Sequence, residues 1–523
     1  MIDRTEAFDY IVVGAGSAGA ALAGRLSDDP GRRILLLDAG PDWRSNTLPQ
    51  ALRHPWQQFS WDVNAVPAEF QWPDLTASRT RQRAARLYIR GRGMGGTSTI
   101  NGCYVIRPPM AEFDDWAAAG AKGWGSSDVL PFFVRCEDDV DFGDEPYHGR
   151  GGPVPVVRAD LADWGTMDEA LRDSALARGH QWEPDHNAPD ALGVSFTAAN
   201  IKDGARVTTN DGYLEPARDR GNLTIVGNAL VDRVLFDRDQ ATGVVVEIHG
   251  EWHEVRGAEV VVCAGAVFSP AILQRSGIGP ARLLKDLGIS VRADLPVGQG
   301  LQDHAGFAVG VILKDGARPS ANGMRGNCTV RYTSDDPSAG TGDVLITDLN
   351  IPAGDKPQGV ILCKLAQCFA RGTLAIPSQD PRALPEIQLN LLGDERDVRR
   401  ARSALRTVFE LVRGPGFDGK VAALVDESVR EIDTCAADPA LDAWAASVVR
   451  ETAHTSSTCR IGPAGDPAAV VGSDLRVHGV GGLRVADLSV APTVPRANTH
   501  LTGVMIGERA ADLMRSAKRR IHD

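Results

Sequence analysis

The stretch FDYIVVGAGSAGAALAGRLSDDPGRRILLLDAG, residues 8–40, decides the fold because it has the pattern of a single βαβ unit. Residues 10–13 form a short apolar run that ends at a glycine, as expected of a strand buried on both faces. A helix rich in Ala and Gly is predicted over 17–26, and a second strand over 34–38 ends on an acid. This order predicts a binding site for an adenine dinucleotide.

Each glycine of the turn has its own task in such a site. Gly14 makes the turn, Gly16 lets a pyrophosphate approach the backbone, and Gly19 lets the helix pack closely on the sheet. Asp38 ends the second strand, where a carboxylate accepts hydrogen bonds from a ribose diol and repels a 2′-phosphate. The alternative is an ordinary helix-packing turn, which the agreement of strands, helix and acid disfavours. The pattern does not separate NAD from FAD.

Length and composition limit the class of protein. A chain of 523 residues exceeds one simple core, so we expect two domains or one large doubly wound domain with an inserted layer. The net charge of -12 disfavours nucleic acid and anionic membrane surfaces as partners. The polar N-terminus lacks a signal peptide's apolar core, and no run of about eighteen apolar residues marks a membrane span. The 8 scattered cysteines lack metal-like clustering and favour reduced thiols in the cytoplasm.

Two loop regions and an acidic run follow the βαβ unit. Residues 41–86 carry four tryptophans, and we expect either a lid or a long loop that the tryptophans fix to the surface. Residues 90–101, RGRGMGGTSTIN, are either a backbone nest near a cofactor or a loop with special dihedral angles. After a helix predicted over 127–136, the acidic run at 137–145 is expected to be a solvated face.

The remaining pattern predicts two kinds of sheet. The strand predicted over 258–263 is expected to join that at 34–38 in one parallel sheet, and the helix after it to begin near Ser269 or Pro270. Beyond residue 304, alternation predicts an antiparallel sheet with one covered face. Its strands are predicted at 343–350, 360–368, 372–376 and 386–392, before an amphipathic helix at 394–413. A strand at 482–487 and a helix at 501–518 complete the first sheet's layers.

Five further segments accompany the first fingerprint: GRGMGGTSTIN (91–101), GAVFSPAILQRSGIG (265–279), LPVGQGLQDH (295–304), HTSSTCRIG (454–462) and GLRVADLSVAPTVPRANTHLTGVMIGERAADL (482–513). From Asp9 to about Met514 the chain thereby resembles the glucose-methanol-choline (GMC) oxidoreductases, FAD enzymes that oxidise alcohols. This resemblance implies an α/β fold with a Rossmann-like FAD-binding domain and an inserted α+β substrate-binding domain built on an antiparallel sheet. The FAD-binding domain is expected at 1–155, 205–310 and 450–523, and the substrate-binding domain at 156–204 and 311–449.

The resemblance also implies which residues bind FAD. Ile100 stands where members with covalent flavin can carry histidine, so we expect non-covalent FAD. Family members more often have glutamate at the ribose-binding acid, which here is Asp38. The implied contacts are Gly14, Gly16, Ser17 and Gly19 with the pyrophosphate, Asp38 with the ribose, Gly93, Gly96, Asn101 and Gly102 along the flavin, Val231 with the adenine, and Asp487 and His500 near the pyrophosphate and isoalloxazine end.

His454 and His500 stand at the positions of the family's catalytic pair. An alcohol must lose its hydroxyl proton as its carbon transfers hydride to flavin N5, and imidazole titrates near the working pH. The resemblance therefore implies that His454 is the base and that His500 hydrogen-bonds the substrate oxygen. Ala453, just before the base, is small where some relatives carry a bulky residue, which indicates room beside the flavin.

Other functions stay open at this point. A lyase of the hydroxynitrile type keeps FAD for structure only, whereas an NAD-dependent dehydrogenase leaves the second glycine loop and the C-terminal histidine segments unexplained. The substrate is open among simple or aromatic alcohols, choline-like or polyol compounds, and sugar or amino-sugar hydroxyls. The net charge of -12 leans only faintly towards a cationic amino-sugar. The electron acceptor, oxygen or another carrier, is equally open.

Overall fold

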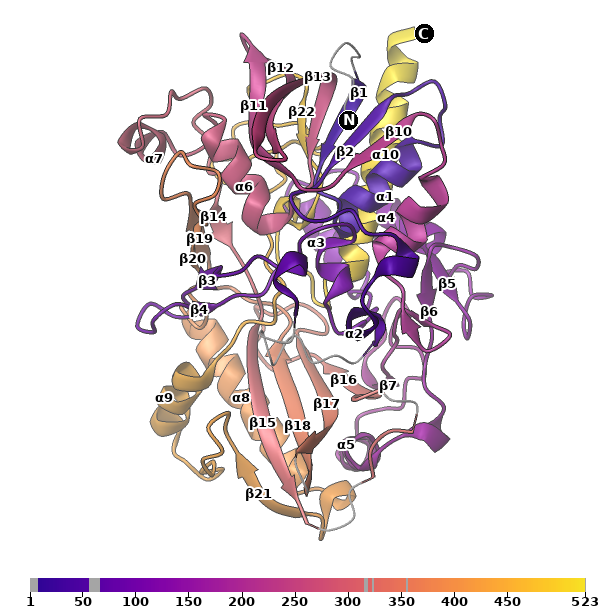
Figure 1. Cartoon of the computed structure of the whole chain (residues 1–523). Helices are drawn as coiled ribbons and strands as arrows, with labels where there is room; N and C mark the ends of the chain where they lie inside the picture. Colours follow the sequence, from indigo (N-terminus) through magenta and orange to yellow (C-terminus); the bar gives the residue numbers. More distant parts are fainter. Residues whose placement is uncertain (1–7, 56–65, 315–317, 322–323, 354–355, 523) are drawn as a thin grey trace.

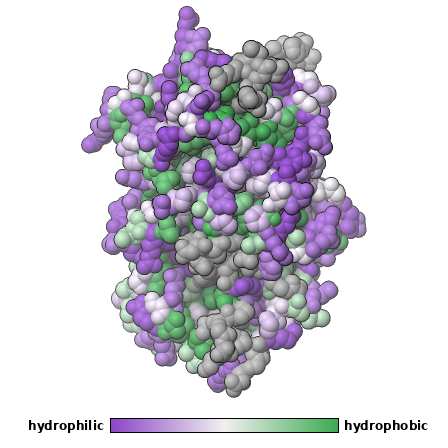
Figure 2. All heavy atoms as spheres, in the orientation of Figure 1, coloured by the Kyte–Doolittle hydropathy of each residue, from purple (hydrophilic) through white to green (hydrophobic). Residues whose placement is uncertain are grey.

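The computed structural model describes residues 8–55, 66–314, 318–321, 324–353 and 356–522. Two large sheets lie one above the other along the long axis of the molecule (Figure 1). Helix α1 (Ser17–Leu26) packs on the upper sheet and α10 (His500–His522) packs on α1, whereas α8 (Glu395–Val412) packs on the lower sheet. Figure 2 shows one face of the molecule, which is mainly hydrophilic with hydrophobic residues in small groups. No described helix is long and apolar enough to cross a membrane.

The upper sheet is built around β1 (Phe8–Val13), whose apolar side chains are almost completely buried. Strand β1 pairs in parallel with β2 (Ile34–Leu37) on one side and β13 (Glu251–Val262) on the other, so the strands predicted at 34–38 and 258–263 share one sheet, as expected. Its strands in spatial order are β10 (Leu223–Val226), β2 (Ile34–Leu37), β1 (Phe8–Val13), β13 (Glu251–Val262), β12 (Gln240–Ile248) and β11 (Ala229–Asp237), with β22 (Leu483–Val485) also on β13.

Helices α1 and α10 join the two ends of the chain. A side chain at Gly507 of α10 would overlap the carbonyl oxygen of Ala18 in α1, so the backbones approach closely. The Ala- and Gly-rich sequence of α1 therefore serves the packing of two helices as well as the approach to the sheet. This packing brings the start of α10 beside the glycine turn of the first βαβ unit.

Helix α6 (Gly265–Arg275) begins earlier than the sequence indicates. Pro270 lies inside the helix and not near its start. Two backbone groups, the first amide of the helix and the carbonyl four residues before Pro270, then have no partner within the helix, and distant residues satisfy both. The Asp487 carboxylate accepts from the Gly265 amide at 2.9 Å and so caps the helix. The Ala266 carbonyl, which Pro270 cannot satisfy, accepts instead from the Thr458 hydroxyl at 2.8 Å.

The lower sheet is antiparallel throughout, and β18 lies at its centre. Its order is β21 (Val421–Val425), β15 (Ala305–Leu313), β18 (Lys356–Leu365), β17 (Val344–Ala353), β16 (Cys328–Tyr332) and β7 (Gly193–Phe196). The predicted strands at 372–376 and 386–392 do not join it. They are shorter and form a separate small sheet of β14 (Gln299–Leu301), β19 (Gly372–Ala375) and β20 (Glu386–Gln388). Strand β15 crosses the domain boundary that we expected at residue 310.

The acidic run at 137–145 is only partly the solvated face that its composition indicates, because Asp141, Asp144 and Glu145 are exposed but two other acids are not. Glu137 and Asp139 are fully buried in β5 (Glu137–Asp139), which pairs with β6 (Val154–Val156). Arg107 forms an ion pair with Glu137 at 2.5 Å, and Arg158 pairs with Asp139 at 2.9 Å. Arginines from other segments thus neutralise the two carboxylates, and charge counting along the chain could not reveal them.

Short elements make up the rest of the described chain. In the loop at 41–86, Trp43 is buried and Trp72 stacks on Phe268, whereas Trp56 and Trp61 lie outside the described residues. The expectation of a lid stays a prediction. The remaining elements are α2 (Gln50–Arg53), α3 (Ala111–Ala118), α4 (Ser126–Cys136), α5 (Thr166–Ala177), α7 (Ala281–Asp286), α9 (Asp438–Val448), β3 (Thr76–Ala77), β4 (Arg86–Leu87), β8 (Ile201–Lys202) and β9 (Ala205–Arg206).

Candidate active site

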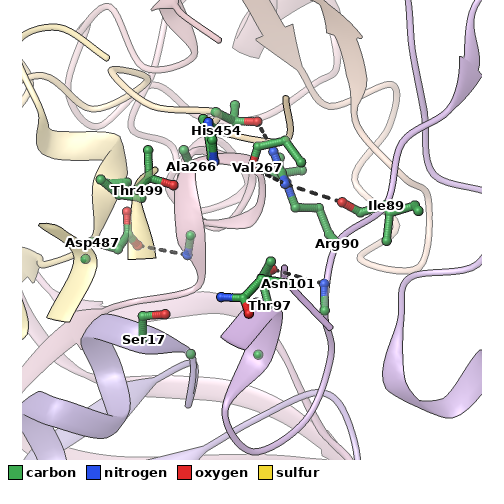
Figure 3. Close-up of a pocket in the computed structure, with 18 of the residues that line it drawn as sticks. Ser17, Ile89, Arg90, Thr97, Asn101, Ala266, Val267, His454, Asp487 and Thr499 are labelled. Carbon is green, nitrogen blue, oxygen red and sulfur yellow. Dashed lines mark hydrogen bonds between the residues drawn. The ribbon is translucent and has the colours of Figure 1, made fainter. Parts of the chain in front are cut away.

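A cavity of about 410 Å³ lies between the upper and lower sheets, and residues of both line it. Both glycine loops line it, as do β18 of the lower sheet and the segments at 450–455 and 498–503. Figure 3 shows Ser17 at one end of the cavity and His454 at the other. Of the residues predicted from the sequence, Gly19 and Gly93 do not line the cavity. Those that line it are Gly14, Gly16, Ser17, Asp38, Gly96, Asn101, Gly102, Val231, His454, Asp487 and His500.

The first glycine turn has the shape that a pyrophosphate requires. Gly14 has φ +103, and a Cβ there would lie 2.5 Å from the Cys263 carbonyl oxygen. A Cβ on Gly16, by contrast, would meet no protein atom within 4 Å, so the cavity is open at this backbone. Gly19 faces the turn itself and not the cavity, and a side chain there would overlap the Gly14 carbonyl oxygen. The residues therefore fit a dinucleotide that approaches at Gly16.

Asp38 joins the two glycine loops. Its carboxylate accepts from the amides of Ala15 at 2.8 Å, Gly40 at 2.9 Å and Gly93 at 2.8 Å. Burial raises the pKa of this carboxyl, whereas the three amides lower it. A carboxylate offers about four acceptor positions, so Asp38 has capacity for about one further donor. That is enough for one ribose hydroxyl, and not for both hydroxyls of the diol.

His500 lies at the dinucleotide end of the cavity. Its Nδ1 is 2.9 Å from the Ser17 hydroxyl oxygen at the start of α1. Burial lowers the pKa of His500 to about 4, so its imidazole is neutral near pH 7. Ser17 lies at the opposite end of the cavity from His454 in Figure 3, so the Nδ1 of His500 is bonded at the dinucleotide end.

The protonation of His454 follows from a chain of contacts. The His304 Nε2 is 2.8 Å from the Pro495 carbonyl oxygen, which can only accept, so this nitrogen carries the hydrogen. Burial lowers the pKa of His304 to about 3, and its Nδ1 is therefore an acceptor. The His454 Nδ1, at 2.9 Å, must then donate to it. This leaves Nε2 of a neutral His454 with a free lone pair, and no described residue hydrogen-bonds that atom.

A buried carboxylate holds the backbone of His454. Both oxygens of Asp303 accept from the His454 amide at 3.0 Å, and one also accepts from the Tyr88 hydroxyl at 2.9 Å. Arg90, which precedes the second glycine loop, donates to the Ala453 carbonyl at 2.8 Å. Burial, with Lys364, His304 and Arg90 nearby, keeps the pKa of His454 well below its usual range. His454 is therefore neutral near pH 7 and can accept a proton.

Sequence reasoning missed several residues of this site. His304 is the last residue of the segment LPVGQGLQDH. A histidine at the end of a motif that resembles the family was the sequence signal that could have identified it. Asn498 lines the cavity two residues before His500, and its Oδ1 accepts from Lys364 Nζ at 2.7 Å. Lys364 belongs to no motif that we could recognise. Only the register of β18 brings it into the cavity.

The chain is similar to known proteins over almost its whole length. Family models described as GMC oxidoreductase match residues 8–306 and 369–507. The chain is 36% identical to a 5-(hydroxymethyl)furfural oxidase of Methylovorus sp. (strain MP688), covering 97% of this chain and 98% of that protein. It is 33% identical to an oxygen-dependent choline dehydrogenase of Burkholderia pseudomallei (strain 1710b), covering 98% and 94%. The structure also resembles pyridoxine 4-oxidase from Mesorbium loti, with a TM-score of 0.86, 28% identity, and 97% and 98% coverage.

A flavin-dependent oxidoreductase of alcohols is the class that the fold and these similarities define. The chain belongs to the GMC oxidoreductase family. FAD is accordingly its cofactor, and the resemblance stated from the sequence is confirmed.

Proposed function

We propose that this protein oxidises the CH–OH group of a small alcohol to the carbonyl, with His454 as the base. The observation that carries the proposal is the free Nε2 lone pair of a neutral His454 at the end of the cavity opposite the glycine turn. A positioned imidazole of this kind takes the hydroxyl proton as the carbon is oxidised. We further propose oxygen as the acceptor, because two relatives are named as an oxidase and an oxygen-dependent dehydrogenase.

In this proposal FAD lies across the two glycine loops, in the FAD-binding domain at 1–155, 205–310 and 450–523. When bound, FAD would supply the oxidant that takes up the hydride from the alcohol carbon. Gly14, Gly16 and Ser17 hold the pyrophosphate, and Asp38 accepts from one ribose hydroxyl. The other proposed contacts are Gly96, Asn101, Gly102, Val231 and Asp487, whereas Gly93, expected from the sequence, bonds Asp38 and does not line the cavity. Because Ile100 stands in the segment GRGMGGTSTIN where a histidine could carry a covalent flavin, the cofactor is proposed to be bound without a covalent link.

The second polar group beside the substrate is Asn498 in this proposal, and not His500. The contact with Ser17 favours His500 at the pyrophosphate end, which is the second of the two roles expected from the sequence. Asn498 lines the cavity and has its amide oxygen bonded to Lys364. Its amide nitrogen is therefore directed by that bond and can donate to the substrate oxygen.

A lyase of the hydroxynitrile type uses the same base without oxidation. The named relatives, an oxidase and a dehydrogenase, do not favour it. The decisive test is an anaerobic absorption spectrum of the purified protein, mixed in turn with alcohols of different classes. We expect one class to bleach the oxidised-flavin band. A band that no alcohol bleaches contradicts the oxidation, and a protein that takes up no FAD contradicts the cofactor site.

His304 is proposed to position the base by fixing its tautomer. Replacing it in His304→Leu removes the acceptor for His454 Nδ1, although Thr452 Oγ1 remains at 2.7 Å. We therefore expect flavin reduction by alcohol to slow by about tenfold, with FAD content unchanged. Adding Thr452→Val should slow it further and change the acid side of the pH profile. An unchanged rate and pH profile in the double variant contradict this role.

A further inference from the structure

Lys364 is a buried cation in the wall of the cavity. It lies on β18, the central strand of the lower sheet, opposite Gly306 of β15 and Leu345 of β17. The side chain lines the cavity, is only 9% exposed, and donates to Asn498 Oδ1 at 2.7 Å. Strand β15 on one side and strand β17 on the other fix its backbone, so the ammonium cannot leave the cavity by a small movement.

No described residue supplies Lys364 with a counter-ion. The carboxylates that line the cavity already have other donors: Asp38 has three amides, Glu451 pairs with Arg79 at 2.5 Å, and Asp487 accepts from Gly265. Asp303, behind the cavity wall, holds the His454 amide. Among the ion pairs of the described residues, none includes Lys364.

A buried ammonium with one protein hydrogen bond is costly unless an anion completes its surroundings. Burial, and then the like charge of Arg331, lower the pKa of Lys364 to about 7, while Asp303 opposes this change. Lys364 in turn acts on the pKa values of His304 and His454. An ammonium has three donors, and Asn498 uses one, so two are available to a ligand in the cavity.

We propose that Lys364 is the anion-binding part of the substrate site and that the alcohol oxidised here carries a carboxylate. This inference rests on the proposed function, because it assigns the substrate class of the same cavity. A substrate carboxylate accepts hydrogen bonds from the two remaining ammonium donors and neutralises the buried positive charge. The same charge repels cationic alcohols such as choline. The local charge of the cavity thus outweighs the net charge of -12, which leaned towards a cationic substrate.

The test compares matched alcohols on the FAD-loaded protein. The probes are the 2-, 3- and 4-(hydroxymethyl)benzoates, neutral benzyl alcohol and the trimethylammonium derivative of benzyl alcohol. We expect one benzoate to exceed benzyl alcohol in kcat/KM by at least about tenfold, and the cation to be the poorest substrate. In Lys364→Met the preference for the anion over benzyl alcohol should fall by at least about tenfold, and Lys364→Arg should keep it.

The pH profile separates a charge effect from loss of shape. In the wild-type protein kcat/KM for the benzoate should fall above about pH 7, where Lys364 loses its proton, but that for benzyl alcohol should not. In Lys364→Arg this alkaline decline should move to higher pH, because guanidinium stays protonated. FAD content and unfolding temperature check that the variants fold. Met removes an unpaired buried charge, so unfolding should not occur earlier.

Calorimetric titration with benzoate, which has no alcohol to oxidise, measures anion binding without turnover. Weaker binding in Lys364→Met than in the wild-type protein supports the inference even if no alcohol reduces the flavin, in which case only the proposed function fails. If benzyl alcohol reduces the flavin as well as every benzoate does, or if Lys364→Met leaves the ratio unchanged, the inference is wrong while the proposed function stands.

Discussion

His454→Asn is expected to slow flavin reduction by the alcohol by roughly 10²–10⁴-fold, the usual contribution of a positioned general base. An asparagine amide nitrogen can take the place of Nδ1 and keep the hydrogen bonds to His304 and Thr452. It has no counterpart to Nε2, so the proton acceptor alone is lost. The measurement is the rate constant for bleaching of the flavin band in an anaerobic stopped-flow experiment.

The matched control is His478→Asn, in a histidine whose Nε2 lies 3.1 Å from the Gly462 carbonyl oxygen. His478 does not line the cavity, so this variant should keep the wild-type rate. FAD content must be the same in both variants. A His454→Asn protein that is reduced at close to the wild-type rate rules out His454 as the base.

Gly16→Ala is expected to weaken FAD binding by at least about tenfold without harming the fold. Gly16 has φ -74 and ψ -165, which alanine adopts without strain. The added methyl group meets no protein atom within 4 Å and projects into the cavity, where the pyrophosphate is proposed to lie. The free protein should therefore unfold at the wild-type temperature, and only the affinity for FAD should change.

Gly221→Ala is a matched control, because its methyl group also meets nothing within 4 Å and Gly221 lies outside the cavity. FAD affinity is measured by fluorescence titration of the protein after the cofactor has been removed, and stability by thermal unfolding. Equal FAD affinity in Gly16→Ala and Gly221→Ala contradicts the place proposed for the pyrophosphate. Loss of stability in Gly16→Ala alone shows that the turn is tighter than the structure indicates.

The sequence predicted the βαβ unit well because its information is local. The apolar run of β1, the glycines and the helix α1 lie within a few residues of each other, and the predicted and observed helix bounds are identical. The start of α6 could not be predicted in this way. Its cap is Asp487, and the carbonyl freed by Pro270 is satisfied by Thr458, both about two hundred residues away.

In the candidate site, too, local features could be predicted from the sequence and long-range contacts could not. His454 could be identified from its motif, and its place in the cavity agrees with that motif. The free lone pair of its Nε2 could not, because it depends on a chain of contacts through His304 to Pro495. For His500, two roles followed from the resemblance, and the contact with Ser17 favours the one at the cofactor.

The sequence by itself determined the family, the cofactor and the glycine turn, because these depend on short motifs whose residues act on one another directly. The tertiary structure alone decided which charged side chains are neutralised and which face the cavity. Glu137 and Asp139 belong to an acidic run, yet arginines from elsewhere bury and neutralise them. Lys364 stands in an ordinary strand, yet strand register brings it into the cavity without a counter-ion. Whether a charged side chain is neutralised depends on its neighbours in space, and the packing of distant segments determines those neighbours.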